Sequence, residues 1–429
     1  MSILIKNATI LTMNDDAPFT GDIRIEGEDI VEIRESIDDA EAKEVIEATG
    51  MAAMPGLINA HQHTPMSLLR GFSDDLRLMD WLEKKMLPAE SRMTPEDIYW
   101  GAKLSMAEMI RSGTTTFADM YIHMNEIAMA TAEVGMRASL TRGLVFQEDD
   151  GGKRISEALE LIHRWHGKAE GRITTMLGPH SPYTCPTESF KDVIHLAENM
   201  NIPIHTHLAE TIEEVVKIKD KYNQTPTEFL YDLGLFEKTH AVLAHSVHLN
   251  DRDITLLKGM RGGVSHNPVS NLKLGCGIAP VLKLIQQGIN VGIGTDGAGS
   301  ATTVDMFEEI KAAAWLQKLE YGDPTRMPAN QALSMATRES AKLLNIHDTV
   351  GTLQVGKKAD VILIDCRKPH LQPIHSIQSL LAYSANGGDV DTTIVNGKIL
   401  MRHRHLLTMD EDELFDQVNK RSRRITQEV

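Results

Sequence analysis

The sequence predicts a (β/α)8 TIM barrel with a small β-sandwich domain that is built from the two ends of the chain. Three observations predict this fold. Eight short apolar runs alternate with amphipathic stretches, polar residues follow several of these runs, and both chain ends read as short strands separated by glycine turns. Eight parallel strands are the number that closes a β/α barrel. A chain of 429 residues is long enough for one large and one smaller domain.

The apolar runs are the expected barrel strands. They cover residues 54–61, 114–120, 137–143, 172–180, 202–210, 241–247, 262–268 and 291–297. Patterns such as residues 94–113 and 186–201 predict helices between them, and Thr94 is a suitable N-cap. An open doubly wound sheet is the alternative. The first helix has no glycine-rich phosphate fingerprint, and polar residues gather where the runs end, as they do in barrel active sites, so the barrel is favoured.

The two chain ends predict a composite β domain. Residues 1–55 with 351–405 would form it, residues 56–350 would form the barrel, and residues 406–429 would form a C-terminal helix. The sequence RSRR at residues 421–424 is expected to be a solvated charged face of that helix.

Composition narrows the classes of function. The formal net charge of −16 argues against a nucleic acid or an anionic membrane as the main partner. Three widely spaced cysteines suggest no disulfide framework. Residues 1–12 lack the apolar core of a signal peptide, and no apolar run reaches the length of a membrane span. We therefore expect a cytoplasmic enzyme.

The sequence LINAHQHTPMSLL, residues 57–69, carries two histidines one residue apart. In a strand, His61 and His63 would share a face, as two ligands of one metal ion must. Imidazole binds zinc, iron, copper and nickel. Taken alone, such a short pattern is more often a chance pair on a loop, so the rest of the chain has to decide.

Further candidate residues follow later runs. His205 and His207 repeat the same spacing, and the spacing does not choose between them. Glu210 is placed to transfer protons near a metal-bound water, although an acid at the start of a helix is the ordinary explanation. Asp296 is either a buried carboxylate paired with a cation or part of an Asp-Gly turn.

His180 and His245 complete the set, and each alone is better explained as a structural histidine. All these residues are expected together at one end of a barrel, and this coincidence favours a shared metal site. Three histidines and one aspartate leave a zinc ion an open position for water, whose pKa falls to roughly 7. The predicted reaction class is hydrolysis or hydrolytic deamination.

The sequence resembles the amidohydrolase superfamily, within the branch of 5-methylthioadenosine/S-adenosylhomocysteine deaminases, from about residue 4 to about residue 400. Two of the matching motifs are common to the superfamily, PGLINAH-x-H and GTL-x-x-GK-x-AD-x-x-x-x-D. The motifs that point more narrowly to the deaminase branch are the glutamate of LPAE, GPHSPYTC and SHNPVSNLKLGCGIAPV.

The resemblance implies a role for each candidate. One metal ion per chain, zinc with iron or nickel as substitutes, would be bound by His61, His63, His207 and Asp296, which chooses His207 over His205. Asp296 would also take the proton of the attacking water, Glu210 would carry it to the purine N1, and His245 would polarise the transition state.

The resemblance also implies the contacts with the substrate, an adenosine-type nucleoside that is converted to its inosine analogue and ammonia. Glu90 would hold the ribose hydroxyls, His180 would contact the nucleoside, and Trp81 would pack on the thioether. Arg142 and Arg154 would hold the carboxylate tail of S-adenosylhomocysteine, in cis or across a subunit boundary of a homo-oligomer. In that branch, the sequence GTDGA, which here contains Asp296, is often followed by ASNN. In this chain it is followed by GSATT at residues 299–303.

Several alternatives stay open at this point. Within the superfamily they are a guanine or cytosine deaminase and a chlorotriazine hydrolase, and Glu210 favours deamination over dechlorination. Outside it they are a metal-binding protein without catalysis and a cysteine hydrolase that uses Cys185 or Cys276. The HxE and PCxxC signatures of the small zinc deaminases do not occur.

Overall fold

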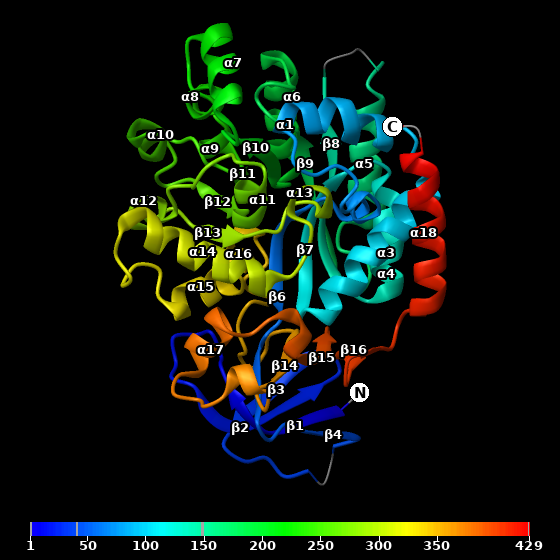
Figure 1. Ribbon diagram of the computed structural model, residues 1–429, viewed down its shortest axis with the longest axis vertical. Coiled ribbons are helices and arrows are strands. Elements are labelled where there is room, and N and C mark those ends of the chain that lie inside the picture. The colour runs from blue at the N-terminus through cyan, green and yellow to red at the C-terminus, as the bar shows by residue number, and fades with distance from the viewer. Residues whose placement is uncertain (1, 40–41, 147–149, 428) are drawn as a thin grey trace.

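The larger part of the molecule is an eight-stranded parallel sheet (Figure 1). The computed structural model describes residues 2–39, 42–146, 150–427 and 429. Along the sheet the strands follow one another in chain order: β6 (Leu57–Gln62), β7 (Thr114–Tyr121), β8 (Arg137–Leu144), β9 (Ile173–Pro179), β10 (Ile204–Leu208), β11 (His240–His245), β12 (Arg261–His266) and β13 (Val291–Ile293). Each predicted run contains or overlaps one of these strands, so the parallel barrel is confirmed.

The last strand returns to the first. The N–H of Asp296 donates to the carbonyl oxygen of His61 at 2.9 Å, and the N–H of Thr295 donates to the side-chain oxygen of Asn59 at 3.0 Å. These bonds nearly close the barrel just beyond β13. They also place Asp296 directly beside His61 although 234 residues separate the two in the chain.

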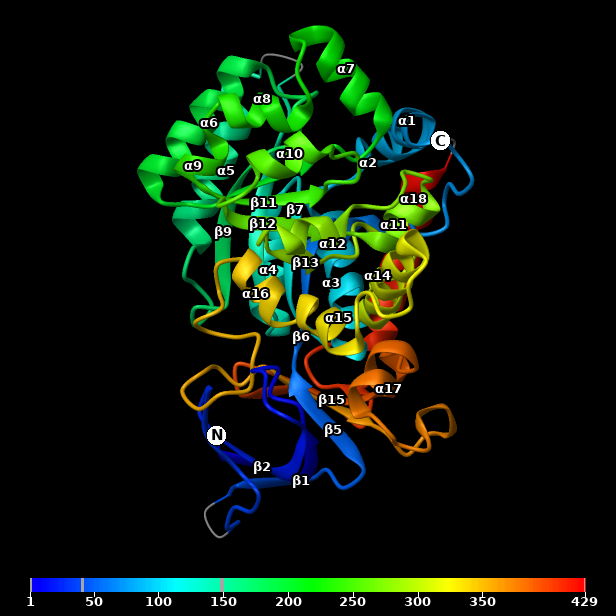
Figure 2. The same cartoon turned by 90° about the vertical axis from the view of Figure 1, so that its left-hand side faces the viewer.

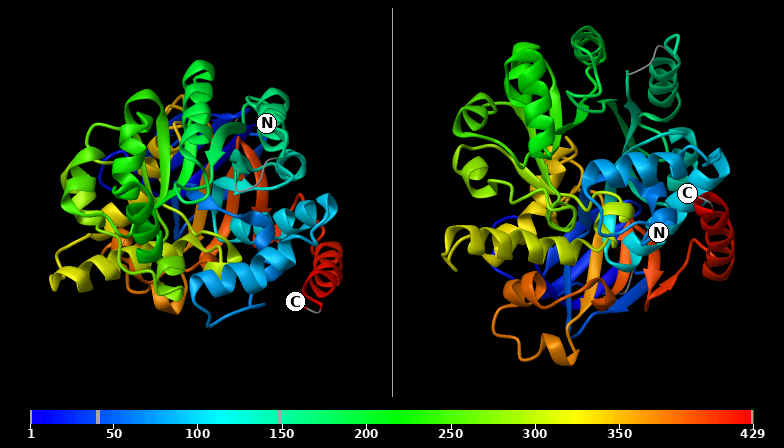
Figure 3. Two further views of the ribbon diagram at one scale, coloured as in Figure 1. Left: turned by 90° about the horizontal axis from the view of Figure 1, so that it is seen from above. Right: turned by 45° about the horizontal axis from the view of Figure 1, so that its top comes forward.

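Helices surround the strands, as the views from the side and from above show (Figures 2 and 3). α3 (Pro95–Arg111) begins at the predicted cap, because the Thr94 hydroxyl accepts the N–H of Asp97 and the Asp97 carboxylate accepts the N–H of Thr94. The other helices of this layer are α4 (Met124–Val134), α5 (Lys153–Trp165), α6 (Thr187–Met200), α7 (Ile212–Tyr222), α8 (Pro226–Asp232), α9 (Leu235–Lys238), α10 (Asp251–Leu256), α11 (Pro268–Lys273), α12 (Val281–Gln286), α13 (Ala298–Ala301), α14 (Met306–Tyr321), α15 (Ala329–Met335) and α16 (Arg338–Leu343).

The two ends of the barrel differ. At the N-terminal end, Ala341 and Leu343 of α16 pack against inward side chains of the strands, among them Ile58, Met176 and Val242. This apolar plug closes that end. At the other end, the chain after β6 makes a long excursion of short helical turns: η1 (Thr64–Leu69), α1 (Leu78–Trp81), η2 (Leu82–Met86) and α2 (Leu87–Glu90). The open end of the barrel is therefore the end at which the polar residues gather.

The chain ends form a second, mixed sheet of nine strands, in the order β17-β16-β15-β14-β5-β1-β2-β3, with β4 also paired to β1. Its strands are β1 (Ser2–Ile10), β2 (Phe19–Glu26), β3 (Asp29–Arg34), β4 (Glu44–Glu47), β5 (Met51–Pro55), β14 (Val361–Asp365), β15 (Val390–Val395), β16 (Lys398–Arg402) and β17 (His405–Leu406). The sheet is continuous, because β5 pairs with both β1 and β14 and so joins the two terminal halves edge to edge. Buried apolar side chains from both halves, among them Ile23, Ile25, Val361 and Ile394, pack together in a core that is separate from that of the barrel.

The C-terminal half of this sheet is tied to the barrel. Arg137, at the start of β8, makes two bonds of 2.9 and 3.0 Å to Asp360, and both side chains are at most 4% exposed. Between the strands of the C-terminal half lie η3 (Pro369–Leu371), α17 (Ile377–Tyr383) and η4 (Gly387–Asp389). The division into domains at residues 55, 350 and 405 stays a prediction.

The C-terminal helix is α18 (Glu411–Thr426), which runs along the barrel beside α3 (Figure 1). The RSRR sequence within it is not simply a solvated face. Arg421 is ion-paired with Glu96 and Asp97 at the start of α3, and Arg424 with Asp97. These arginines fasten the helix because the N-terminus of α3 presents two acids to them. In the described residues, no helix has the length and apolarity that crossing a membrane requires.

Candidate active site

The predicted metal ligands lie together at the open end of the barrel. There are two groups of side chains, and within each group all ligand atoms lie within 4.8 Å of one another. One group is His61, His207 and His245, and the other is His61, His63 and Asp296. His61 belongs to both, so the two groups form one cluster. Its members come from the ends of β6, β10, β11 and β13, four strands that are far apart in the sequence.

His61 is fully buried and offers one nitrogen to the cluster. Its Nδ1 lies 2.8 Å from Nε2 of His205. Its Nε2 lies 3.5 Å from Oδ1 of Asp296 and has no hydrogen-bond partner among the described residues. Burial lowers the pKa of His61 to about 3, so the ring is neutral and one of its two nitrogens has a free lone pair. A buried, unpartnered imidazole nitrogen beside a carboxylate fits a divalent metal ion.

The two other predicted histidine ligands are oriented in the same way. Nδ1 of His63 lies 2.6 Å from the carbonyl oxygen of Met120, and Nδ1 of His207 lies 2.9 Å from that of His180. A carbonyl accepts, so Nδ1 carries the proton in both rings and Nε2 is left to bind a metal. Metal-binding histidines commonly donate their second nitrogen in this way.

His205 and His207 lie at different positions relative to the cluster. The His205 ring contacts Nδ1 of His61, on the side away from the free Nε2. The His207 ring lies 4.9 Å from the His61 ring and 5.5 Å from the His63 ring, between centroids. His207 thus lies within the cluster, and His205 supports a member of it. The sequence spacing alone left this choice open.

Asp296 is held by several hydrogen bonds. Its Oδ2 accepts the hydroxyls of Ser270 at 2.6 Å and Ser300 at 2.9 Å, and its Oδ1 accepts the N–H of Gly297 at 2.8 Å. Burial opposes ionisation, but the neighbouring imidazoles hold the pKa of Asp296 well below its usual range. Asp296 is therefore a buried, charged carboxylate. Ser300 belongs to the segment at residues 299–303 that departs from the expected pattern.

Glu210 and His245 face each other across the cluster. Nε2 of His245 lies 3.9 Å from Oε2 of Glu210, and Nδ1 of His245 lies 3.0 Å from Oδ1 of Asn271. The Glu210 side chain is 14% exposed, and burial raises its pKa. A carboxyl group with a raised pKa is suited to both accepting and donating a proton near neutral pH.

The predicted substrate contacts surround the cluster. The His180 ring lies 4.6 Å from the His207 ring between centroids. Glu90, on α2, accepts the hydroxyl of Tyr121. Trp81, on α1, is buried and touches the segment after Asp296, since a Cβ atom on Gly299 would lie 3.4 Å from its ring. The tightest contact of such a Cβ atom would be with Cε of Met66, at 2.9 Å, so a glycine at this position lets the departing segment pack closely against Met66.

Arg142 and Arg154 lie further out and each has an acidic partner in the chain. Arg142, on β8, donates to Glu157 at 2.8 Å, and Arg154, on α5, donates to Asp150 at 3.1 Å. The structure brings neither arginine into the histidine cluster. A substrate carboxylate would have to compete with these acids for the two guanidinium groups.

The cysteines do not resemble activated nucleophiles. Cys185 is buried with its thiol donating to the carbonyl oxygen of Leu144, and Sγ of Cys276 lies 4.0 Å from Oε1 of Glu210. Burial raises the pKa of both thiols, so little thiolate forms at neutral pH. The geometry therefore disfavours a cysteine hydrolase.

Sequence reasoning missed the residues that hold the candidates in place: Ser270, Ser300, Asn271, Tyr121 and Glu214. Some left a signal. Ser270 and Asn271 belong to the quoted motif SHNPVSNL, and Thr211 with Glu214 has the spacing of a capping box. Tyr121 directly follows the apolar run at residues 114–120, but its bond to Glu90 joins different parts of the chain and could not be predicted.

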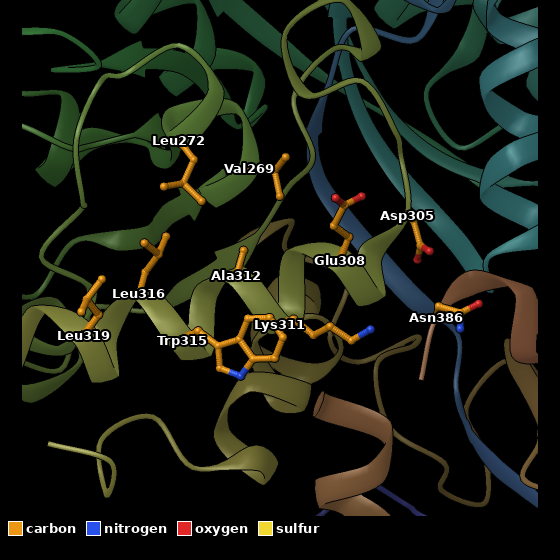
Figure 4. Close-up of a pocket in the computed structure, with 10 residues that line it drawn as sticks. All are labelled: Val269, Leu272, Asp305, Glu308, Lys311, Ala312, Trp315, Leu316, Leu319 and Asn386. Atoms are coloured by element: carbon orange, nitrogen blue, oxygen red, sulfur yellow. The ribbon is translucent and has the colours of Figure 1, made fainter. Parts of the chain in front are cut away.

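A separate hollow of about 620 Å³ lies on the outside of α11 and α14 (Figure 4). Val269 and Leu272 line one side, and Trp315 and Leu319 project from α14. None of its lining residues is a predicted site residue, so it is distinct from the candidate active site.

Comparison with known proteins gives consistent matches over the whole chain. The profile of the Amidohydrolase family matches residues 52–400. A 5-methylthioadenosine/S-adenosylhomocysteine deaminase of Desulforudis audaxviator is 46% identical, with 100% of both chains aligned. A 5'-deoxyadenosine deaminase of Methanosarcina acetivorans is also 46% identical, over 97% of this chain and 96% of its own. Among solved structures, an adenosine deaminase from Xanthomonas campestris with bound zinc superposes with a TM-score of 0.94 at 32% identity, covering 99% of this chain and 98% of that one.

Proposed function

Because this chain belongs to the amidohydrolase family, we propose that its histidine cluster catalyses metal-dependent hydrolytic deamination of adenosine-type nucleosides, which yields the inosine analogue and ammonia. One observation carries the proposal. His61, His63 and His207 each have Nδ1 engaged; Nε2 of His61 and of His63 lies 3.5 and 3.3 Å from a buried, charged Asp296, and His207 shares a ligand group with His61. Glu210 and His245 lie beside this set, and the carboxyl group of Glu210 is suited to transferring protons.

The residues fit one divalent ion per chain on His61, His63, His207 and Asp296. We take the ion to be zinc, which is bound in the Xanthomonas structure, and iron or nickel would suit the same ligands. Such an ion lowers the pKa of water and so supplies a nucleophile at neutral pH.

The chain's own residues then manage the protons. Asp296 accepts a proton from the attacking water, and Glu210 delivers a proton to N1 of the purine, which makes C6 more electrophilic. His245 orients the nucleophile and stabilises the charge that develops. Asp296 then passes the proton that it accepted to the amino group, which leaves as ammonia, and the hydroxyl proton of the product returns to Glu210. Asp296 and His245 are buried, and Oε2 of Glu210 lies 3.9 Å from Nε2 of His245, so the transfers are short.

The rest of the substrate is bound around this centre. Glu90 would accept the ribose hydroxyls, His180 would contact the base, and Trp81 would pack on a 5' substituent. Arg142 and Arg154 would hold the carboxylate of S-adenosylhomocysteine, in competition with Glu157 and Asp150. The relatives named for methylthioadenosine, S-adenosylhomocysteine and 5'-deoxyadenosine support a nucleoside with a variable 5' group. We also propose a cytoplasmic homo-oligomer.

The test is a substrate panel with zinc-loaded protein. Ammonia release and the change from adenine to hypoxanthine absorbance are followed with methylthioadenosine, S-adenosylhomocysteine, 5'-deoxyadenosine and adenosine, and with guanine, cytosine and a chlorotriazine as controls. Turnover of adenine nucleosides above the controls is the expected result. Turnover of a control compound alone, with zinc bound, would overturn the proposal.

A further inference from the structure

Glu214, in the first turn of α7, is a buried acid whose side chain turns away from its own helix. It is 5% exposed. Its Oε1 accepts the N–H of Ala209 and its Oε2 accepts the N–H of Glu210, both at 3.0 Å. In a capping box, an acid at this position returns to the N–H of the N-cap residue, here Thr211. Glu214 instead reaches one and two residues further back, into the turn that follows β10.

That turn has a conformation that needs support. Ala209 has a φ of 48°, in the left-handed region that is unfavourable for a residue with a Cβ atom. Its carbonyl oxygen accepts the N–H groups of Val247 at 3.1 Å and His248 at 2.9 Å. The next loop thus holds the carbonyl side of the turn, and Glu214 holds the N–H side. Both sides have to be held for the turn to keep its direction.

The direction of this turn decides where the Glu210 side chain lies. The Glu210 carboxylate is 3.9 Å from Nε2 of His245 and 4.0 Å from Sγ of Cys276, and both distances exceed a strong hydrogen bond. These contacts are too long to fix its position, so the backbone must do so. We propose that Glu214 is a positioning residue for Glu210. This inference rests on the proposed function, in which Glu210 transfers the proton.

The first test is Glu214→Gln with Glu213→Gln as its matched control. The amide group of Gln cannot accept a hydrogen bond through its nitrogen, so one of the two backbone N–H groups loses its partner. A shift of about 1 Å in a catalytic group costs up to ~10²-fold in rate. We expect kcat to fall ~10- to ~100-fold, with KM and zinc content unchanged. Glu213 is exposed on the same helix, so its variant has the same charge change and should keep full activity.

A double mutant separates positioning from a general structural effect. If Glu214 acts through Glu210, Glu214→Gln should add less than about twofold to the loss already caused by Glu210→Gln. Should Glu214→Gln fail to fold, Glu214→Asp takes its place, since it keeps the charge and shortens the reach.

Each outcome decides between the two levels of the argument. If kcat falls in Glu210→Gln but is normal in the Glu214 variant, the positioning role of Glu214 is overturned and the proposed function stands. Multiplying losses in the double mutant also overturn it, because Glu214 would then act by another route. A normal kcat in Glu210→Gln itself overturns the proton-transfer role, and the positioning inference with it.

Discussion

His205→Ala and His207→Ala should differ sharply in their effect on metal binding, although the two residues share one strand and the same spacing. His207 directs Nε2 into the cluster, while His205 touches only the far nitrogen of His61 among the cluster's ligand rings. Losing a residue that supports a ligand typically costs 10- to 100-fold in metal affinity, or about 1.4–2.7 kcal/mol. Losing a ligand itself should cost more than ~100-fold.

The assay is competition for zinc between the purified variants and chelators of graded strength, with zinc per chain measured after dialysis. Far-ultraviolet circular dichroism checks that each variant is folded. His240→Ala is the control, because His240 lies at the opposite end of β11 and bonds the carbonyl oxygen of Leu343. Its affinity should equal that of the wild type. Full zinc retention in His207→Ala, together with complete loss in His205→Ala, would refute the assignment of ligands.

Three further variants test other parts of the site and the fold. Glu210→Gln should lose at least ~10²-fold in kcat while it keeps its zinc, and near-normal kcat on every nucleoside would reopen a reaction without an amine leaving group. Arg142→Met should raise KM for S-adenosylhomocysteine about tenfold to a hundredfold and spare adenosine, since a charge-assisted bond contributes roughly 1.5–3 kcal/mol; equal losses on both substrates would remove its role in tail binding. Asp360→Ala leaves Arg137 buried without its carboxylate partner and should lower the free energy of unfolding by about 3–5 kcal/mol in urea titrations. The control, Asp365→Ala, breaks a more exposed pair and should lower it by less than about 1 kcal/mol. Equal effects would contradict this account of how the small sheet is attached.

The fold could be predicted from the sequence because barrel strands leave local signals. Each strand is a short apolar run, and the C-terminal ends of parallel strands meet at the same end of a barrel. Residues such as His61 and Asp296 could therefore be grouped before any contact was known. The pairing of β5 with both β1 and β14 could not be predicted, because strand order depends on contacts between the two chain ends.

The same limit applies within the site. Spacing tells which face of a strand a histidine occupies, but not which ring nitrogen is already engaged, and this alone distinguishes His207 from His205. The bond from Ser270 to Asp296 joins residues 26 apart in the chain, so no periodicity predicts it, whereas the bond from Ser300 is a local contact across four residues. Glu214 left a capping pattern, but the pattern predicts a bond to Thr211 and not the reach to Ala209 and Glu210.

The central claim is that one metal ion in the His61, His63, His207 and Asp296 cluster makes this chain a nucleoside deaminase. The most direct test is to strip the protein with a chelator, add back zinc in measured steps, and record ammonia release from methylthioadenosine at each step. Turnover should rise in proportion to bound zinc and level off at one zinc per chain. Undiminished turnover in the stripped protein, or none when one zinc per chain is bound, would contradict the account.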